Sequence, residues 1–205
     1  MRRQPNEVRL RPGVFRPGAV NSEITVPSST FPASNDRIGV RIVAAIGRRN
    51  ELGLNNQLLF RLKDDMANFR RITATTPLLM GRKTWDSFPR RPLPGRPNIV
   101  ATRNLQFMAP GAHIYSSVPP ALAAARAMAA QAGVPEVSVI GGVSIFAEAL
   151  PFSTHMTLTE VEAEQEADVF FPDFDRAEWR EVAARRVAAD AANEHAFVIR
   201  ELQRR

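Results

Sequence analysis

From residue 38 onward, short runs rich in β-branched residues alternate with segments of helical periodicity. This alternation is typical of an α/β domain, in which helices flank a mainly parallel sheet. After Asp168 the pattern becomes strand-like, with an acidic turn between two runs, which indicates an antiparallel C-terminal edge. We therefore predict an α/β fold with a mainly parallel central sheet and about four flanking helices. The expected strands are 38–46, 77–80, 98–101, 137–140, 156–161, 182–187 and 196–202, and the expected helices are 62–73, 83–88, 119–132 and 143–149.

The first 37 residues have a different character. They are rich in Pro, Arg, Ser and Asn and show no sustained helical or strand periodicity. We predict a flexible basic extension at 1–37, followed by one domain at 38–205. A transit peptide and a mis-assigned start codon are alternative explanations of the extension.

Composition excludes several classes of function. The chain has no cysteine and only three histidines, which are far apart, so we predict no disulfide and no bound metal. No apolar run approaches the length of about 20 residues that spans a bilayer, so we expect a cytoplasmic protein without a membrane partner. The formal net charge is +6, but half of it lies in the first 37 residues, and the predicted domain is only mildly basic. Nucleic acid is therefore not an expected partner.

Two adjacent acids lie at the start of the helix expected at 62–73. Asp65 falls within an apolar stripe of that helix, whereas Asp64 points away from it. A carboxylate on an apolar face is costly unless it binds a partner. It either stabilises the exposed N–H groups of the first helical turn or binds a ligand, and helix geometry alone favours the first explanation.

Two strand-to-helix junctions have the features of phosphate sites. At 81–84 a glycine precedes two cations and a hydroxyl, and at 141–146 paired glycines precede a helix. Helix N-termini present free N–H donors, and glycines allow a ligand to approach the backbone closely. An ordinary capped helix would also explain either junction. Neither has the G-x-G-x-x-G spacing of the common dinucleotide fingerprint.

Taken in order, these segments resemble dihydrofolate reductase of the bacterial chromosomal type, over essentially all of residues 38–205. The order of the segments is more specific than any one of them. The matching segments are 42–46, 52–56, Asp65, 80–85, 91–98, 140–142, 158–159 and 168–172.

The resemblance implies NADPH-dependent reduction of 7,8-dihydrofolate to 5,6,7,8-tetrahydrofolate by a monomer. The implied catalytic residues are Asp65, Thr159 and Phe60. Asp65 would hold the pterin ring with support from Thr159, and partial burial should raise the pKa of Asp65. Phe60 would lie in the loop that closes over the nicotinamide. Arg96 would bind the α-carboxylate of the substrate's glutamate. The implied substrate-binding residues are Val43, Ala44, Ala45, Asp65, Met66, Phe69, Phe88, Leu93, Arg96, Ile140 and Thr159.

The resemblance also implies a cofactor site for NADPH. Arg82 and Arg103, with Thr102 beside them, would bind the ribose 2′-phosphate and favour NADPH over NADH. The implied cofactor-binding residues are Ala45, Ile46, Leu52, Asn56, Gly81, Arg82, Lys83, Thr84, Thr102, Arg103, Ile140, Gly141, Gly142, Val143, Ser144, Ile145 and Phe146.

Three residues depart from the family pattern. Leu59 and Phe60 replace the usual proline-tryptophan pair, and Phe146 replaces a common tyrosine. The riboflavin-pathway pyrimidine reductase shares the fold and the cofactor, but it lacks the acid and the arginine found here at Asp65 and Arg96. A catalytically silent relative that serves as a binding module is the third interpretation.

Overall fold

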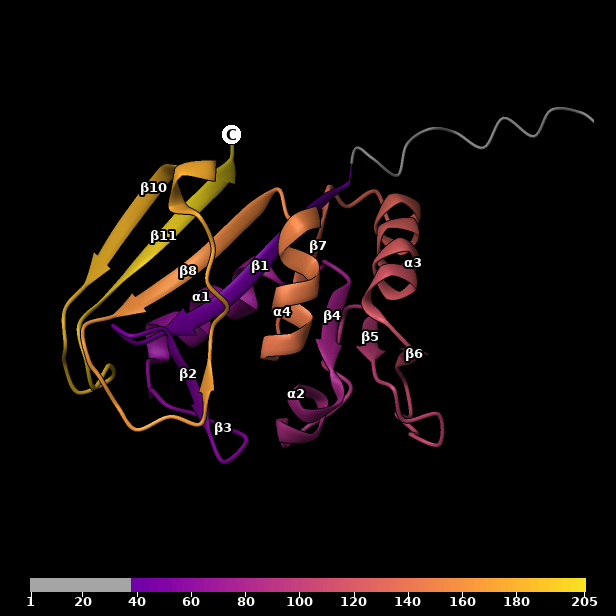
Figure 1. The fold of residues 1–205 in the computed structure, drawn as a ribbon, viewed down its shortest axis with the longest axis horizontal. Helices are drawn as coiled ribbons and strands as arrows, with labels where there is room; N and C mark the ends of the chain where they lie inside the picture. Colours follow the sequence, from indigo (N-terminus) through magenta and orange to yellow (C-terminus); the bar gives the residue numbers. More distant parts are fainter. Residues whose placement is uncertain (1–37) are drawn as a thin grey trace, which may run out of the picture. The chain divides into compact units, whose positions relative to one another are not determined.

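The computed structural model describes residues 38–205, so the extension predicted at 1–37 lies outside the described part (Figure 1). Residues 38–205 form an eight-stranded sheet in the order β10-β11-β8-β1-β7-β4-β5-β6 and a three-stranded sheet in the order β3-β2-β9. The strands of the large sheet are β1 (Gly39–Ile46), β4 (Leu78–Gly81), β5 (Asn98–Ala101), β6 (His113–Tyr115), β7 (Glu136–Val139), β8 (His155–Val161), β10 (Trp179–Val187) and β11 (Phe197–Arg204). The small sheet contains β2 (Glu51–Leu54), β3 (Gln57–Leu58) and β9 (Val169–Phe170).

The large sheet is parallel from β8 to β6 and antiparallel at the other edge. β1 pairs in parallel with β7 and β8, whereas β11 pairs in antiparallel fashion with both β8 and β10. The predicted mainly parallel sheet with an antiparallel C-terminal edge is confirmed. The parallel strands β4, β5 and β7 are largely buried, as expected of strands covered on both faces.

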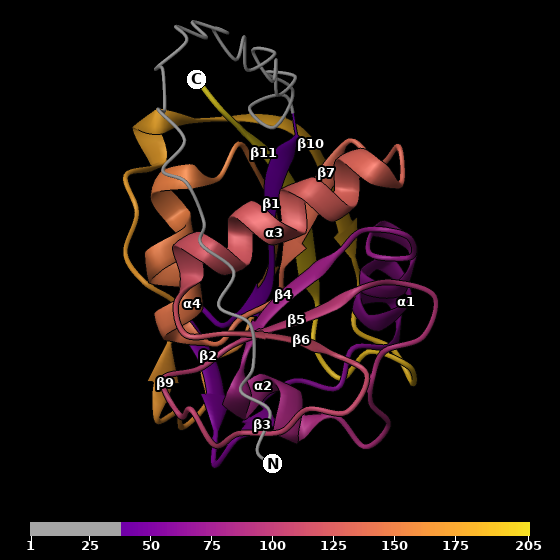
Figure 2. The same ribbon diagram turned by 90° about the vertical axis from the view of Figure 1, so that its right-hand side faces the viewer.

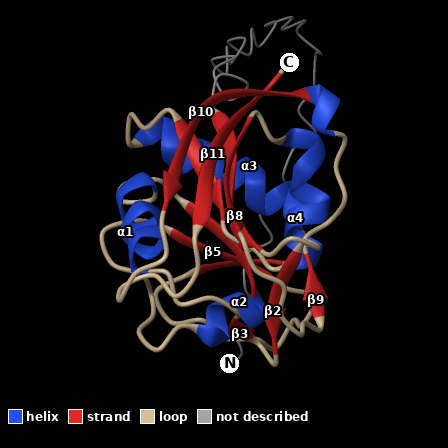
Figure 3. Cartoon of the chain, turned by 90° about the vertical axis from the view of Figure 1, so that its left-hand side faces the viewer, coloured by secondary structure: helices blue, strands red, loops and turns tan. Residues whose placement is uncertain are grey.

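Four α-helices accompany the sheet: α1 (Lys63–Ile72), α2 (Arg82–Ser87), α3 (Val118–Gln131) and α4 (Val143–Ala149). Helix α1 lies on one face of the sheet, and α3 and α4 lie on the other (Figures 2 and 3). Buried alanines of α3 pack directly against the strands, because a small side chain allows the helix to approach closely. The largest group of buried apolar residues lies between the sheet and these two helices.

The predicted element boundaries agree with the structure to within one to three residues, but short strands were missed. β2, β3, β6 and β9 have only two to four residues each, too few to show a periodic pattern. β10 begins at Trp179, three residues before the predicted start, and a register shift between Glu181 and Ala183 interrupts its alternation.

Two further observations concern residues 38–205 only. No helix among them is long and apolar enough to cross a membrane. They contain no cluster of three or more His, Asp or Glu side chains that could hold a metal ion.

Candidate functional site

The centre of the site is a short hydrogen bond between α1 and β8. The hydroxyl of Thr159 donates to Oδ1 of Asp65 at 2.6 Å. Thr159 is itself buried, and its strand holds it opposite Ala45 of β1 and Ile199 of β11. The sheet thus fixes the hydroxyl that orients the carboxylate.

Asp65 is half-buried in the first turn of α1. Burial raises the pKa of Asp65 above its usual value, and the hydrogen bond from Thr159 and the charge of Arg185 lower it by less. By contrast Asp64 is exposed, and its Oδ2 accepts a hydrogen bond from the amide of Asn193 at 3.3 Å. The two acids therefore differ as helical periodicity predicted.

The apolar residues predicted around Asp65 share one property: each is half-buried, and four of them also pack against the buried core. They come from β1, α1, the segment after α2 and the end of β7, so elements distant in sequence supply them. Apolar surface left partly accessible beside a carboxylate is what a flat aromatic ligand with a polar edge requires. These residues are Val43, Ala44, Ala45, Met66, Phe69, Phe88, Leu93 and Ile140.

Helix α1 differs from the prediction in one respect. The only buried residue of α1 is Asn68, whose Oδ1 accepts a hydrogen bond from Arg71 at 2.8 Å. Leu62 immediately precedes the helix and is also buried, whereas Met66 and Phe69 are half-buried. The apolar stripe thus serves the site more than the core.

Phe60 lies between β3 and α1. Its ring meets His195 edge-on, with the centroids 5.9 Å apart, and it packs against a cluster formed by Leu62, Val161, Phe197 and Ile199. Phe60 therefore packs against the C-terminal edge of the sheet. Its predicted part in catalysis stays a prediction.

Arg96 lies in a turn whose shape depends on several hydrogen bonds. Its Nη1 donates to the carbonyl and the hydroxyl of Thr73, at 2.6 and 2.7 Å, and its Nε donates to the carbonyl of Pro94. The buried Asn98 also hydrogen-bonds the backbone of Leu93 and Arg96. Arg96 is therefore a half-buried, oriented cation, and burial lowers its pKa from the usual value.

The two predicted phosphate junctions are adjacent in space. β4 and β7 are neighbouring parallel strands, and the N–H of Gly81 donates to the carbonyl of Gly141 at 2.7 Å. The Gly141–Gly142 peptide is cis, and Gly141 has φ +105°, a conformation that favours glycine. Neither α2 nor α4 has a side-chain cap, so the N–H groups that open both helices are available to an anion.

The cations predicted to bind phosphate lie at the same edge. Arg82 and Lys83 begin α2 after β4, and Arg103 follows the neighbouring strand β5. Arg82, Lys83 and Arg103 are exposed, and Arg82 lies 3.6 Å from Asp86. Asn56 joins the loop after β2 to this edge, since its amide donates to the carbonyl of Lys83 at 3.2 Å.

The remaining predicted cofactor residues fall into two groups. Some are core residues, and the others are accessible at the carboxyl edge of the sheet or beside it. The core residues are Ile46, Ile145 and Phe146, and the others are Ala45, Leu52, Thr84, Thr102, Ile140, Val143 and Ser144.

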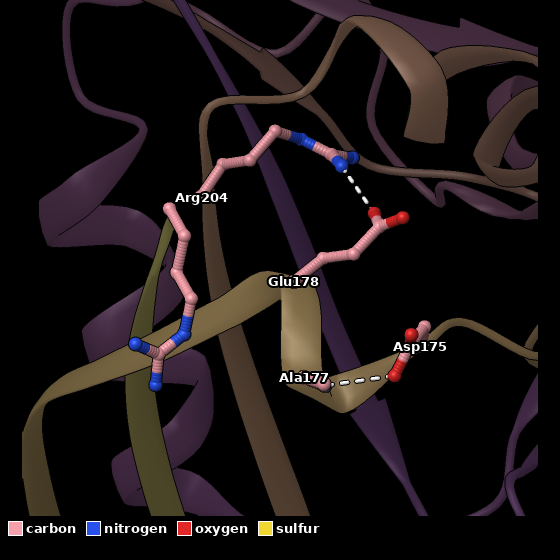
Figure 4. A pocket seen from close by; sticks show the side chains of 5 residues that line it. Asp175, Ala177, Glu178 and Arg204 are labelled. Carbon is pink, nitrogen blue, oxygen red and sulfur yellow. Dashed lines mark hydrogen bonds and ion pairs between the residues drawn. The ribbon is translucent and has the colours of Figure 1, made fainter.

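A separate hollow of about 350 Å³ lies at the far end of β11, near the carboxyl terminus (Figure 4). There Glu178 pairs with Arg204, and a carboxylate oxygen of Asp175 accepts a hydrogen bond from the N–H of Ala177 at 2.8 Å. Most of its polar groups are thus satisfied within the protein. It contains none of the predicted site residues.

Sequence reasoning missed Asn98 and Arg185 near the site, and the buried carboxylate of Glu51, whose partner is Arg49. Glu51 and Asn98 are buried polar residues on strands, where periodicity predicts only that a side chain faces inward. The register of the antiparallel edge places Arg185 on the face of the sheet on which Thr159 contacts Asp65. Strand pairing could have indicated it, but sequence spacing could not.

Known proteins are similar to this chain over nearly all of the described residues. The family model described as dihydrofolate reductase matches residues 39–204. The dihydrofolate reductase of Neisseria meningitidis serogroup A is 37% identical over 161 residues, covering 78% of this chain and 95% of the relative. That of Mycobacterium tuberculosis is 38% identical over 146 residues, covering 69% of this chain and 84% of the relative.

A solved structure is similar over the same region. It is dihydrofolate reductase from Enterococcus faecalis complexed with NADP(H) and RAB-propyl. It is 29% identical, with a TM-score of 0.72, and the match covers 81% of this chain and 96% of that one.

Proposed function

The chain belongs to the dihydrofolate reductase family. We propose that Asp65 binds the pterin, that Arg96 binds the glutamate of the substrate, and that the junction of Gly81 with Gly141 binds the cofactor. The protein is an NADPH-dependent oxidoreductase that reduces 7,8-dihydrofolate to 5,6,7,8-tetrahydrofolate. We further propose that it acts as a monomer in the cytoplasm, with no nucleic acid as partner.

Asp65 is the group that binds the pterin. A carboxylate with two acceptor oxygens matches the ring N–H and exocyclic amine of the pterin edge, while the half-buried apolar residues contact the ring faces. Thr159 holds one oxygen in place from the buried strand. This hydrogen bond, made at the centre of the apolar site, is the observation that carries the proposal.

Asp65 also favours protonation of the substrate. Reduction adds a hydride to pterin C6 and a proton to N5, so positive charge develops on the ring. A fixed carboxylate nearby stabilises that charge. Because burial raises its pKa, Asp65 also holds a proton at a higher pH than an exposed aspartate does.

The residues at the carboxyl edge of β4, β5 and β7 fit NADPH. The uncapped N-termini of α2 and α4 and the paired glycines leave room and N–H donors for a diphosphate. Arg82 and Arg103, with Thr102, would hold the 2′-phosphate. NADPH supplies the hydride, and the half-buried residues Ala45 and Ile140 would border its nicotinamide.

The role of Arg82 is tested by comparing the two nicotinamide cofactors. We expect Arg82→Ala to weaken NADPH binding about tenfold more than NADH binding, because only NADPH carries the 2′-phosphate. Fluorescence titration gives both dissociation constants. Arg90→Ala, which removes an exposed cation from the segment after α2, should change neither. An equal loss for both cofactors would refute the assignment.

The role of Arg96 distinguishes this reaction from pyrimidine reduction. We expect Arg96→Gln to raise the KM for dihydrofolate at least about tenfold, because a charge-assisted pair with the glutamate is lost. A dihydropterin without the glutamate should be unaffected. The assay follows NADPH oxidation, with a ribosylamino-pyrimidinone as the control substrate. Reduction of that control, and not of dihydrofolate, would overturn the proposed function.

A further inference from the structure

The strand register aligns four side chains on the face of the sheet that α1 covers. Arg185 of β10 lies opposite Ile199 of β11, Ile199 lies opposite Thr159 of β8, and Thr159 lies opposite Ala45 of β1. Residues directly opposite one another point to the same face. Since Thr159 contacts Asp65, Arg185 points to the same face of the sheet as the catalytic carboxylate.

Arg185 forms no ion pair and no side-chain hydrogen bond within the described part of the chain. It is exposed on an edge strand, and none of the ion pairs among residues 38–205 includes it. The next residue, Arg186, points to the opposite face and pairs with Glu162 at 2.7 Å. Arg186 therefore provides a matched control of the same residue type on the same strand.

The other charged groups near the start of α1 are engaged elsewhere or point outward. Asp64 contacts Asn193, whose N–H donates to Asp190, and Glu194 accepts a hydrogen bond from the N–H of Arg61. Lys63 is exposed, and β8, β11 and β1 present Thr159, Ile199 and Ala45 toward Asp65. His195 packs against Phe60. The charge of Arg185 lowers the pKa of Asp65 and opposes the effect of burial.

We propose that Arg185 is a positioning residue of the active site, acting across the edge of the sheet to favour the ionised form of Asp65. The interaction is long-range and partly screened by water. It offsets part of the cost of burying the carboxylate, and so sets the pH range over which Asp65 changes charge. Its effect on the reaction rests on the role proposed for Asp65, but its effect on the titration of Asp65 does not.

The direct test is the carbon-13 NMR titration of the Asp65 carboxyl in the ligand-free protein. We expect Arg185→Gln to raise the midpoint by about half a pH unit, the effect of one unit charge about 10 Å away in a largely aqueous environment. Arg185→Glu should raise it by about one unit, and Arg185→Lys should leave it near the wild-type value. Added salt should raise the wild-type midpoint toward that of Arg185→Gln.

Single-turnover hydride transfer gives the second readout. At a pH above the midpoint, Arg185→Gln should react about threefold faster than wild type, because loss of the nearby cation triples the fraction of complexes in which the pair formed by Asp65 and the substrate holds the proton. A merely structural defect would not raise the rate. An unchanged Asp65 titration in Arg185→Gln, or an equal shift in Arg186→Gln, would overturn the proposal. A shifted titration with an unchanged rate profile would preserve the electrostatic link and refute the role of Asp65 in protonation.

Discussion

Glu51 and Asp65 both have carboxylates that are at least partly buried, but they differ in how many hydrogen-bond donors each carboxylate has. Glu51, at the start of β2, is completely buried. Its Oε2 accepts a hydrogen bond from the N–H of Arg49 at 2.7 Å, and its Oε1 accepts one from the Arg49 guanidinium at 3.0 Å. Asp65, at the start of α1, is only half-buried, and its one side-chain donor is Thr159.

The two pKa values shift in opposite directions. Burial would raise the pKa of Glu51, but hydrogen bonds from the backbone N–H groups of Glu51 and Arg49, and from the Arg49 guanidinium, lower it by more. At Asp65 burial outweighs the hydrogen bond from Thr159 and the charge of Arg185. A fully satisfied carboxylate stabilises a fold, whereas an incompletely satisfied one keeps binding capacity for a ligand.

The largest effect on the reaction is expected when the carboxylate of Asp65 is removed. Asp65→Asn should lower the rate of hydride transfer at neutral pH about a hundredfold or more, because the developing charge on the pterin loses its carboxylate. The rise in rate with acidity should also disappear. Stopped-flow measurements between about pH 5 and pH 9 give both results. A variant with the wild-type rate and pH profile would refute the assignment.

The adjacent acid provides the control for that experiment. Asp64→Asn removes an exposed carboxylate of the same helix turn, which contacts Asn193 rather than the site. Its rate should stay within about twofold of wild type. A similar loss in both variants would mean that the helix start as a whole, and not Asp65, is required.

A smaller effect is expected at Glu51, on stability rather than on rate. Glu51→Gln should lower the free energy of unfolding by about 2 kcal/mol, because the buried carboxylate loses charge-assisted hydrogen bonds from the N–H and the exposed guanidinium of Arg49. Because the pKa of Glu51 lies below 4.5 in the folded state, this contribution is complete above pH 4.5. It is then lost as the pH falls through the folded-state pKa, so the variant and wild type should converge in acid.

Urea unfolding at several pH values measures this difference. Glu164→Gln is the matched control, since Glu164 is a more exposed partner of Arg49 at 3.4 Å. That control should change the unfolding free energy by less than about 0.5 kcal/mol. If Glu51→Gln instead altered the pH profile of hydride transfer and left stability intact, the division between the two carboxylates would be wrong.

Much of the fold followed from local patterns, whereas the roles of Asp65 and Thr159 followed from the family resemblance. Alternating strand and helix periodicity predicted the parallel sheet, and helical phase distinguished Asp65 from Asp64. Glu51 was not predicted, because a turn that places two N–H groups around one carboxylate has no periodic signature. Arg185 was not predicted either, since its position depends on pairing between strands β10, β11 and β8.

The central claim is that Asp65, and not Glu51, is the carboxylate that binds the substrate. One carbon-13 NMR titration of the carboxyls of Asp65 and Glu51 tests this claim directly. Without ligand, Asp65 should titrate above its ordinary value of 3.8 and Glu51 below 4.5. Adding dihydrofolate with NADP⁺, which cannot donate a hydride, should shift the titration of Asp65 and leave that of Glu51 unchanged. An Asp65 signal that titrates at or below 3.8, and that ignores the ligand, would contradict the account.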